Sequence, residues 1–175
     1  NYKNKTESIA NQRKSGNAVI ENDDISIPDL FKKLTIAFVN IKSISNNCCT
    51  YFVTAPQGGE LGMMMMMMKD AGLPVRHVLI WKKNHAVFSM GRLDYDYQHE
   101  PILLTWNKTH KFYGLGNHKT SIWSIDRPNA SKEHPTMKPV ELVANALLNN
   151  SKQNDLVIDF FLGSGTTMVA SHQLN

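Results

Sequence analysis

Cysteine is scarce in this chain of 175 residues: there are two, and they are adjacent, Cys48 and Cys49. Neighbouring residues on a strand point to opposite faces, so these thiols cannot easily form a disulfide and are expected to be buried. No cysteines are spaced like a zinc ligand set, and no combined set of cysteine and histidine suggests a metal site. The sequence therefore predicts no disulfide and no metal centre.

Long apolar runs are also missing. No signal peptide is recognisable and no stretch could span a bilayer, so the cytoplasm is the default expectation. Hydrophobic residues make up 42% of the chain, which is enough for a packed core. The length suits one domain or most of one.

The charge is mildly basic, with 19 lysines and arginines against 15 acidic residues and a net charge of +4. Such a balance is compatible with a polyanionic partner without identifying one. Residues 1–22 are polar and rich in asparagine, and they contain Lys3, Lys5, Arg13 and Lys14. This segment has too few apolar residues to bury, so we predict a mobile loop.

The middle of the chain alternates between helix and strand patterns. A helix is predicted after Ser26 and Pro28, because apolar residues follow at helical spacing as far as Ile41. Six consecutive methionines, Met63 to Met68, are expected on a second helix, where methionine fills irregular space in the core. The other regular elements of this half are predicted to be strands, at residues 48–53, 75–82 and 100–106.

Near the C-terminus, a predicted strand leads into a glycine turn that opens a helix. The apolar run 156–158 ends at Asp159 and predicts a parallel strand buried on both faces. Gly163 and Gly165 allow a tight turn and a close approach to a ligand, which a Cβ would prevent. The two threonines that follow place free backbone N–H groups at a helix start, which suits a carboxylate or a phosphate.

Two common phosphate sites do not match this turn. A dinucleotide fingerprint needs a third glycine three residues after Gly165, and that position is Met168. A P-loop needs a lysine directly after the second glycine, and none is present. The glycine turn alone therefore leaves its ligand open.

Two clusters considered together point to a family. The lysine–proline segment, residues 134–142 (HPTMKPVEL), and the glycine loop, residues 159–167 (DFFLGSGTT), are separated by a predicted helix and strand. This combination resembles the amino-group DNA methyltransferases, which use S-adenosylmethionine. The order, with the cofactor loop after the target-binding half, looks like the permuted β arrangement. Upstream pieces extend the resemblance to roughly residues 20–175: they are Trp81-Lys82-Lys83, Gly91-Arg92-x-Asp94-Tyr95 and His99-Glu100-Pro101-Ile102-Leu103.

The resemblance implies an α/β fold of the Rossmann-like, S-adenosylmethionine-dependent methyltransferase type, in a bacterial or phage-encoded protein. It also implies a division of the chain after the loop at 1–22. A target-binding half would occupy residues 23–106, a DNA-recognition segment 107–133, and the start of the cofactor-binding half 134–175.

The resemblance further implies that the lysine–proline segment and the glycine loop hold the methionine end of the cofactor. Asp159 suits the cofactor's ammonium, although a carboxylate there can also simply accept hydrogen bonds from the turn. Phe161 would be a wall of the cofactor site instead of a core residue. Lys138, between two prolines that restrict the backbone, would reach a carboxylate instead of lying in solvent. The implied cofactor-binding set is Thr136, Lys138, Pro139, Asp159, Phe161, Gly163, Ser164, Gly165, Thr166 and Thr167, and His134 is expected to be structural.

DNA is the implied partner. Basic residues could neutralise its phosphates, and the candidates are Lys82, Lys83, Arg92, Lys108, Lys111 and Lys119. The loop at 83–98 also contains Tyr95 and Tyr97, which we expect to pack on the sheet, and Glu100 is expected to pair with Arg92. The opening segment could clamp DNA or could be merely disordered, and the sequence does not choose between them.

The chain contains no Pro-Pro pair. In the family, an Asp/Asn/Ser-Pro-Pro-aromatic segment accepts the hydrogens of the target amine and stacks on the flipped base, because that amine is a poor nucleophile. We therefore predict no catalytic residue in this chain and no methyl transfer by the chain alone. The family also has, about 20 residues past the glycine loop, a strand that ends in an acidic residue for the ribose hydroxyls, and the sequence ends before that position, so truncation at both ends is expected. The sheet should lack the central catalytic-motif strand and the last strands of the cofactor half. A homodimer partner or another chain would fill the gap, or the region would be poorly ordered.

Three functions stay open. The first is a DNA methyltransferase fragment, with adenine N6 favoured over cytosine N4 on family frequency alone. The second is a non-catalytic remnant of a methyltransferase that binds DNA or a partner protein. The third is a Rossmann-type oxidoreductase or other nucleotide-binding domain, which Met168 and the lysine–proline segment disfavour.

Overall fold

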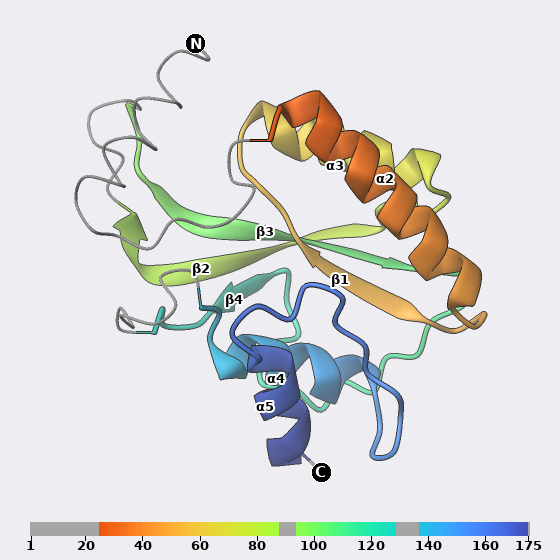
Figure 1. Ribbon diagram of the computed structural model, residues 1–175. Coiled ribbons are helices and arrows are strands. Elements are labelled where there is room, and N and C mark those ends of the chain that lie inside the picture. The colour runs from red at the N-terminus through yellow and green to blue at the C-terminus, as the bar shows by residue number, and fades with distance from the viewer. Residues whose placement is uncertain (1–24, 88–93, 129–136, 175) are drawn as a thin grey trace.

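The structure is a computed structural model, and it describes residues 25–87, 94–128 and 137–174. The predicted loop at 1–22 lies outside these residues. In chain order the elements are α2 (Ile27–Ile44), β1 (Thr50–Thr54), α3 (Gly59–Asp70), β2 (His77–Val87), β3 (Tyr97–Trp106), β4 (Ile122–Ser124), α4 (Val140–Asn150) and α5 (Thr166–Leu174). Figure 1 shows α2 and α3 on one side of a central sheet and α4 and α5 on the other.

The sheet has four strands in the order β1-β3-β2-β4. β3 pairs antiparallel with both β1 and β2, whereas β4 runs parallel to β2. Within the described residues, β1 and β4 are therefore the edge strands. This mixed and incomplete sheet between helices agrees with the predicted α/β class.

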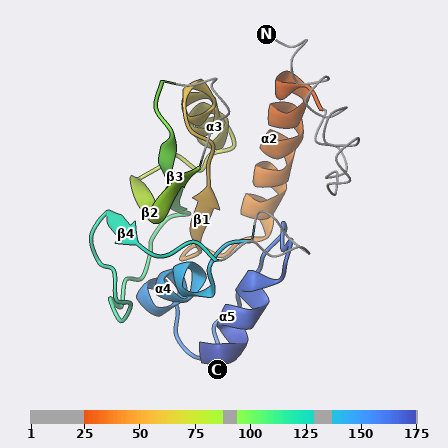
Figure 2. The ribbon, with the colours of Figure 1, turned by 90° about the vertical axis from the view of Figure 1, so that its left-hand side faces the viewer.

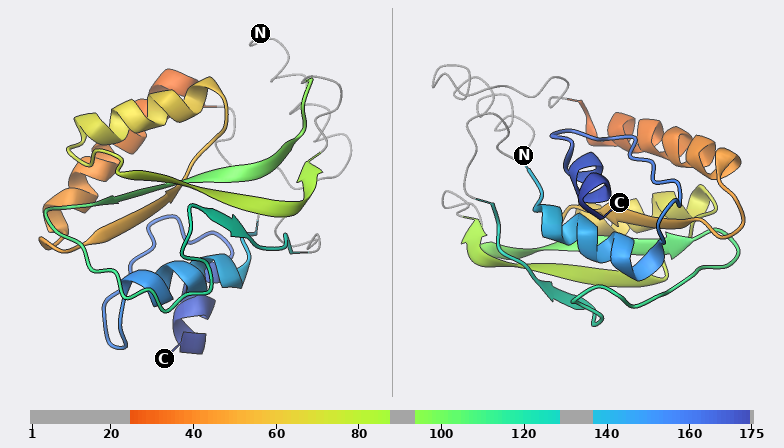
Figure 3. Two further views of the ribbon diagram at one scale, coloured as in Figure 1. Left: turned by 180° about the vertical axis from the view of Figure 1, so that it is seen from behind. Right: turned by 90° about the horizontal axis from the view of Figure 1, so that it is seen from below.

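Alternation along the strands builds a separate core on each face of the sheet. On one face, Met68 and Leu103 are fully buried among side chains of α2, α3 and β1. On the other face, Trp81 and Ile102 pack with Leu142 from α4. Figure 3 shows α4 lying along this second face. The sheet thus separates the methionine helix from the helix that follows the lysine–proline segment.

The helix predictions for the first half are confirmed. α2 begins where Ser26 accepts a hydrogen bond from the Asp29 backbone N–H at 3.2 Å, with Pro28 in the first turn. The methionine run forms α3 and contributes Met64, Met67 and Met68 to the core, as expected from packing. Other methionines of the run, Met63 and Met66, are exposed.

The prediction that Cys48 and Cys49 are buried on a strand is wrong. β1 begins at Thr50, and both cysteines precede it as half-buried free thiols. The side chain of Asn46 accepts a hydrogen bond from the Cys48 backbone N–H at 3.1 Å. This local bond stabilises a turn in place of an extended strand start.

The hairpin of β2 and β3 is longer than the sequence predicts, because β2 continues to Val87 and β3 already begins at Tyr97. Residues 88–93 of the connecting loop, Arg92 among them, lie outside the described residues. Tyr95 is 85% exposed, so the prediction that it packs on the sheet is wrong. Tyr97 is half-buried and contacts His99 edge-on.

The predicted strand at 156–158 does not form. Leu156 is 85% exposed and Ile158 is 56% exposed, and the segment pairs with no strand of the described residues. A buried parallel strand needs a neighbour on each side, because its backbone groups otherwise stay unpaired. Phe160, just beyond this segment, lines a groove with α2 residues, and Figure 2 shows the segment between α2 and α5. A sheet that lacks the neighbouring strand, as expected from the sequence, would leave this segment without a pairing partner.

Two buried asparagines of α4 fix the segment that precedes β4. Asn149 accepts a hydrogen bond from the Gly116 backbone N–H at 3.0 Å, and Asn145 accepts one from the His118 N–H at 2.9 Å. Both side chains also donate to the His118 carbonyl. Sequence reasoning did not identify this clamp, which ties much of the predicted DNA-recognition segment to α4.

Gly116→Ala is expected to lower the free energy of unfolding by about 1–3 kcal/mol, because the added methyl has no room. A Cβ at this position would lie 2.5 Å from the Asn145 side-chain oxygen and 2.8 Å from the Asn145 carbonyl oxygen. Urea denaturation measures the loss. Gly62→Ala is the matched control, since open space surrounds Gly62 on α3. A loss of stability in Gly116→Ala that is equal to or smaller than that in Gly62→Ala would contradict the clamp.

Among the described residues, none of the helices is both long enough and apolar enough to cross a membrane.

Candidate functional site

The glycine loop owes its shape to two left-handed residues. Gly163 has φ +54° and Gly165 has φ +80°, conformations that residues with a Cβ rarely adopt. The Asp159 carboxylate accepts hydrogen bonds from the Phe161 backbone N–H at 2.9 Å and from the Thr167 hydroxyl at 2.6 Å. Asp159 thus organises the turn, as one of the two interpretations of this residue expected, while it remains exposed.

The structure joins the glycine loop to the lysine–proline segment. Thr166, buried at the start of α5, donates a hydrogen bond to the Lys138 carbonyl at 3.3 Å. Its hydroxyl also lies 3.0 Å from that of Ser164. Pro139 is buried and occupies the N-cap position of α4, without a side-chain capping hydrogen bond. Two clusters nearly 30 residues apart in sequence therefore meet at the adjacent starts of α4 and α5.

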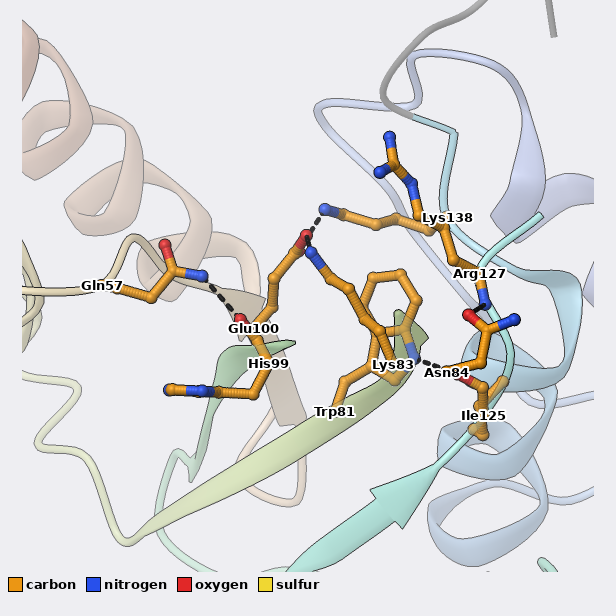
Figure 4. Close-up of polar contacts among 9 residues, drawn as sticks. All are labelled: Gln57, Trp81, Lys83, Asn84, His99, Glu100, Ile125, Arg127 and Lys138. Carbon is orange, nitrogen blue, oxygen red and sulfur yellow. Dashed lines mark hydrogen bonds and ion pairs between the residues drawn. The ribbon is translucent and has the colours of Figure 1, made fainter. Parts of the chain in front are cut away.

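The Lys138 side chain binds a carboxylate of the hairpin (Figure 4). Its ammonium contacts Glu100 Oε2, while the Lys83 ammonium lies 2.7 Å from Glu100 Oε1. Both ammonium groups also lie over the ring of Trp81, at 5.6 and 5.3 Å from its centre. We call Lys83, Glu100 and Lys138 the lysine–glutamate cluster.

Strand pairing explains why this cluster forms. Trp81 and Lys83 are two residues apart on β2 and share a face, and Glu100 on β3 lies directly opposite Trp81. The Trp81 indole N–H donates to the Ile125 carbonyl at 2.7 Å, which ties β2 to the residues after β4. Strand alternation in the sequence indicates that Trp81 and Lys83 share a face. Only the register of β2 against β3 shows that Glu100 lies opposite Trp81.

The electrostatics of Glu100 reflect its two lysines. Burial raises the pKa of Glu100, but the hydrogen bonds and charges of Lys138 and Lys83 outweigh it and hold the pKa below its ordinary value. The expected partner Arg92 lies outside the described residues. The two lysines are the partners seen in the structure.

The predicted cofactor residues are partly accessible. Asp159, Phe161, Gly163 and Ser164 are exposed, Thr167 is half-buried, and Gly165 is buried. Lys138 also lines a pocket with Asn84, Asp126, Arg127, Met137, Pro139, Val140 and Glu141. Thr136 and His134 lie outside the described residues.

The predicted DNA-binding lysines differ in their exposure to solvent. Lys82 and three lysines of residues 107–133, the predicted DNA-recognition segment, are exposed: Lys108, Lys111 and Lys119. Lys83, by contrast, is 5% exposed and is bound to Glu100. The prediction that Lys83 contacts DNA phosphates is therefore wrong, because strand alternation places it on the same face as the buried Trp81, opposite to that of Lys82. Arg92 lies outside the described residues.

The architecture defines a methyltransferase-like α/β fold. The chain superposes on the structure of M1.HpyAVI in complex with S-adenosylmethionine with a TM-score of 0.68, at 23% identity, covering 82% of this chain and 72% of that one. A second M1.HpyAVI structure gives a TM-score of 0.66 at 21% identity, covering 82% of this chain and 70% of that one.

The sequence model of the DNA methylase family matches residues 13–175, so the chain belongs to that family. It is 30% identical over 120 residues to the type II methyltransferase M.HinfI of Haemophilus influenzae, covering 58% of this chain and 33% of that protein. It is 25% identical over 126 residues to M2.LlaDCHI of Lactococcus lactis subsp. cremoris, covering 62% of this chain and 46% of that protein. The chain thus spans between a third and a half of the length of these relatives.

Proposed function

We propose that the chain contributes the cofactor-binding part of a DNA methyltransferase that uses S-adenosylmethionine. The observation that carries this proposal is the hydrogen bond from the Thr166 hydroxyl to the Lys138 carbonyl, which joins the glycine loop to the lysine–proline segment. Membership of the DNA methylase family supports the same assignment.

The residues present fit the methionine end of this cofactor. The Asp159 carboxylate is exposed and suits an ammonium, and the Lys138 side chain, 32% exposed, suits a carboxylate. Phe161, 66% exposed, offers an apolar wall beside Gly163, which has no Cβ to block a ligand. The backbone N–H groups at the start of α5 add a further anion-binding element.

In this proposal, the residues of the chain bind and orient and do not perform the chemistry. Asp159, Lys138 and Phe161 fix one end of the ligand, and the paired starts of α4 and α5 fix the position of these side chains. When bound, S-adenosylmethionine supplies the electrophilic methyl group. Catalysis depends mostly on positioning an acceptor amine in line with that group.

The proposed acceptor is an exocyclic amine of a DNA base, with adenine N6 favoured over cytosine N4. The exposed lysines Lys82, Lys108, Lys111 and Lys119 are the proposed phosphate contacts. The proposed partner that completes the sheet is a second copy or another chain, next to the segment 156–158, which has no strand partner among the residues described. The alternative function is a non-catalytic methyltransferase remnant that binds DNA or a partner protein.

Calorimetric titration with S-adenosylhomocysteine tests the proposed cofactor site. Lys138→Ala is expected to weaken binding by about tenfold or more, since it removes a charge-assisted bond worth about 1.5–3 kcal/mol. Lys69→Ala is the control, because Lys69 is an exposed lysine near the end of α3 on the opposite face of the sheet. Equal affinities of the two variants would contradict the role of Lys138. Failure of the unaltered protein to bind would favour the non-catalytic alternative.

No methyl transfer to DNA is expected from the chain of residues 1–175 by itself. It contains no Pro-Pro pair, and therefore no Pro-Pro-aromatic segment to hold the target amine. Incorporation of labelled methyl groups from S-adenosylmethionine into unmethylated genomic DNA provides the measurement. A complete amino-group methyltransferase serves as the positive control, and turnover by this chain would refute the expectation.

A further inference from the structure

The lysine–glutamate cluster contains two cations and one anion. Lys83 and Lys138 each bind a different oxygen of Glu100, so the three side chains together bear one excess positive charge. The Lys83 side chain is 4% exposed, whereas that of Lys138 is 32% exposed. A ligand can therefore reach Lys138, but Lys83 is confined to the inner side of Glu100.

This arrangement resolves a conflict at Lys138. A carboxylate ligand that approaches Lys138 also approaches Glu100, which is bound to the same ammonium. In a site with low effective dielectric, repulsion between two carboxylates a few ångströms apart is large. A lysine on the other oxygen of Glu100 offsets that repulsion, and it does so without touching the ligand.

We propose that Lys83 is a buried positioning residue of the cofactor site. It offsets the charge of Glu100, so that the Lys138 ammonium can bind the cofactor's carboxylate while Glu100 holds that lysine side chain in place. This inference rests on the proposed function. The pKa of Glu100 is lowered by its lysines, which agrees with a carboxylate that stays ionised and keeps both lysines bound.

A comparison of two ligands tests the role of Lys83. S-adenosylhomocysteine has the amino-acid carboxylate, whereas 5′-methylthioadenosine keeps the nucleoside and the thioether but lacks the amino-acid group. Calorimetry of the Lys83→Met variant is expected to show about tenfold weaker binding of the first ligand. Binding of the second ligand should stay unchanged. The variant leaves Glu100 paired with Lys138, so no carboxylate loses its last partner.

Two more variants separate charge from structure. Lys83→Gln keeps a hydrogen-bond donor for Glu100 but removes the charge. It should show the same loss of affinity for S-adenosylhomocysteine that is expected of Lys83→Met, and it provides the test if the methionine variant folds poorly. Lys69→Met removes an exposed lysine from α3, on the face of the sheet opposite the cluster (Figure 1), and should bind both ligands like the unaltered protein.

Each outcome decides one point. Weaker binding of both ligands by the Lys83 variants would show a general structural role and overturn the inference. Unchanged binding of S-adenosylhomocysteine by these variants, with binding lost in Lys138→Ala, would overturn the inference and leave the proposed function standing. No binding of S-adenosylhomocysteine by the unaltered protein would overturn the proposed function and the inference together.

Discussion

Glu100→Ala is expected to lower the free energy of unfolding by about 3–5 kcal/mol, because it leaves a buried ammonium without its carboxylate. The Lys83 side chain is 4% exposed, and Glu100 is the partner that its ammonium contacts at 2.7 Å. The same carboxylate holds Lys138, so β3 and the lysine–proline segment lose a direct link. Urea denaturation near pH 7 provides the measurement.

Glu141→Ala is the matched control for this variant. The Glu141 side chain is 56% exposed at the start of α4 and lies 3.7 Å from His118. An exposed pair of this kind contributes less than about 1 kcal/mol. Similar losses in the free energy of unfolding for Glu141→Ala and Glu100→Ala would show that burial of the lysine–glutamate cluster does not contribute to stability.

The effect of Glu100 should also depend on pH. Its pKa is lowered in the folded protein, so its contribution is present above its unfolded pKa of about 4.5. That contribution is lost as the pH falls through the folded pKa. The difference in stability between the unaltered protein and Glu100→Ala should therefore shrink in acid. A difference that stays constant down to pH 3 would argue against an ion pair as its origin.

Gly163→Val is expected to weaken the binding of S-adenosylhomocysteine by more than about tenfold. The backbone at Gly163 has φ +54°, which a β-branched residue adopts only under strain, so the loop must change shape. The Asp159 carboxylate, which bonds to both sides of this turn, would then move relative to Lys138. Calorimetry measures the affinity.

The fold should survive Gly163→Val, because the loop is exposed and a Cβ there would meet no atom closer than 3.6 Å. Gly62→Val, on α3 in open space and without a positive φ, is the control and should bind like the unaltered protein. Equal affinities of the two variants would show that the glycine loop does not shape the cofactor site.

Local chemistry explains which elements the sequence could predict. The capping residue Ser26 and the apolar spacing after Pro28 define α2 without help from the rest of the chain. The glycine turn and the helix that follows it also depend on near neighbours, and both are present at 163–174. The resemblance to amino-group methyltransferases agrees with the family to which the chain belongs.

Pairing between distant segments explains what the sequence could not predict. The run at 156–158 has the composition of a buried strand, yet it pairs with no strand in the part of the chain that the structure describes, because strand formation depends on neighbours that no local pattern supplies. Lys83 was predicted to contact phosphates because it begins a long loop that mixes basic, aromatic and glycine residues. Only the register of β2 against β3 reveals that Lys82 is exposed while Lys83 faces Glu100.

The most direct test of the central claim, that the lysine–proline segment and the glycine loop form one cofactor site, is amide chemical-shift mapping with S-adenosylhomocysteine. We predict that Lys138 and the amides of residues 163–167 shift together, with one common affinity. Shifts confined to one of the two segments, or located elsewhere in the chain, would contradict the claim.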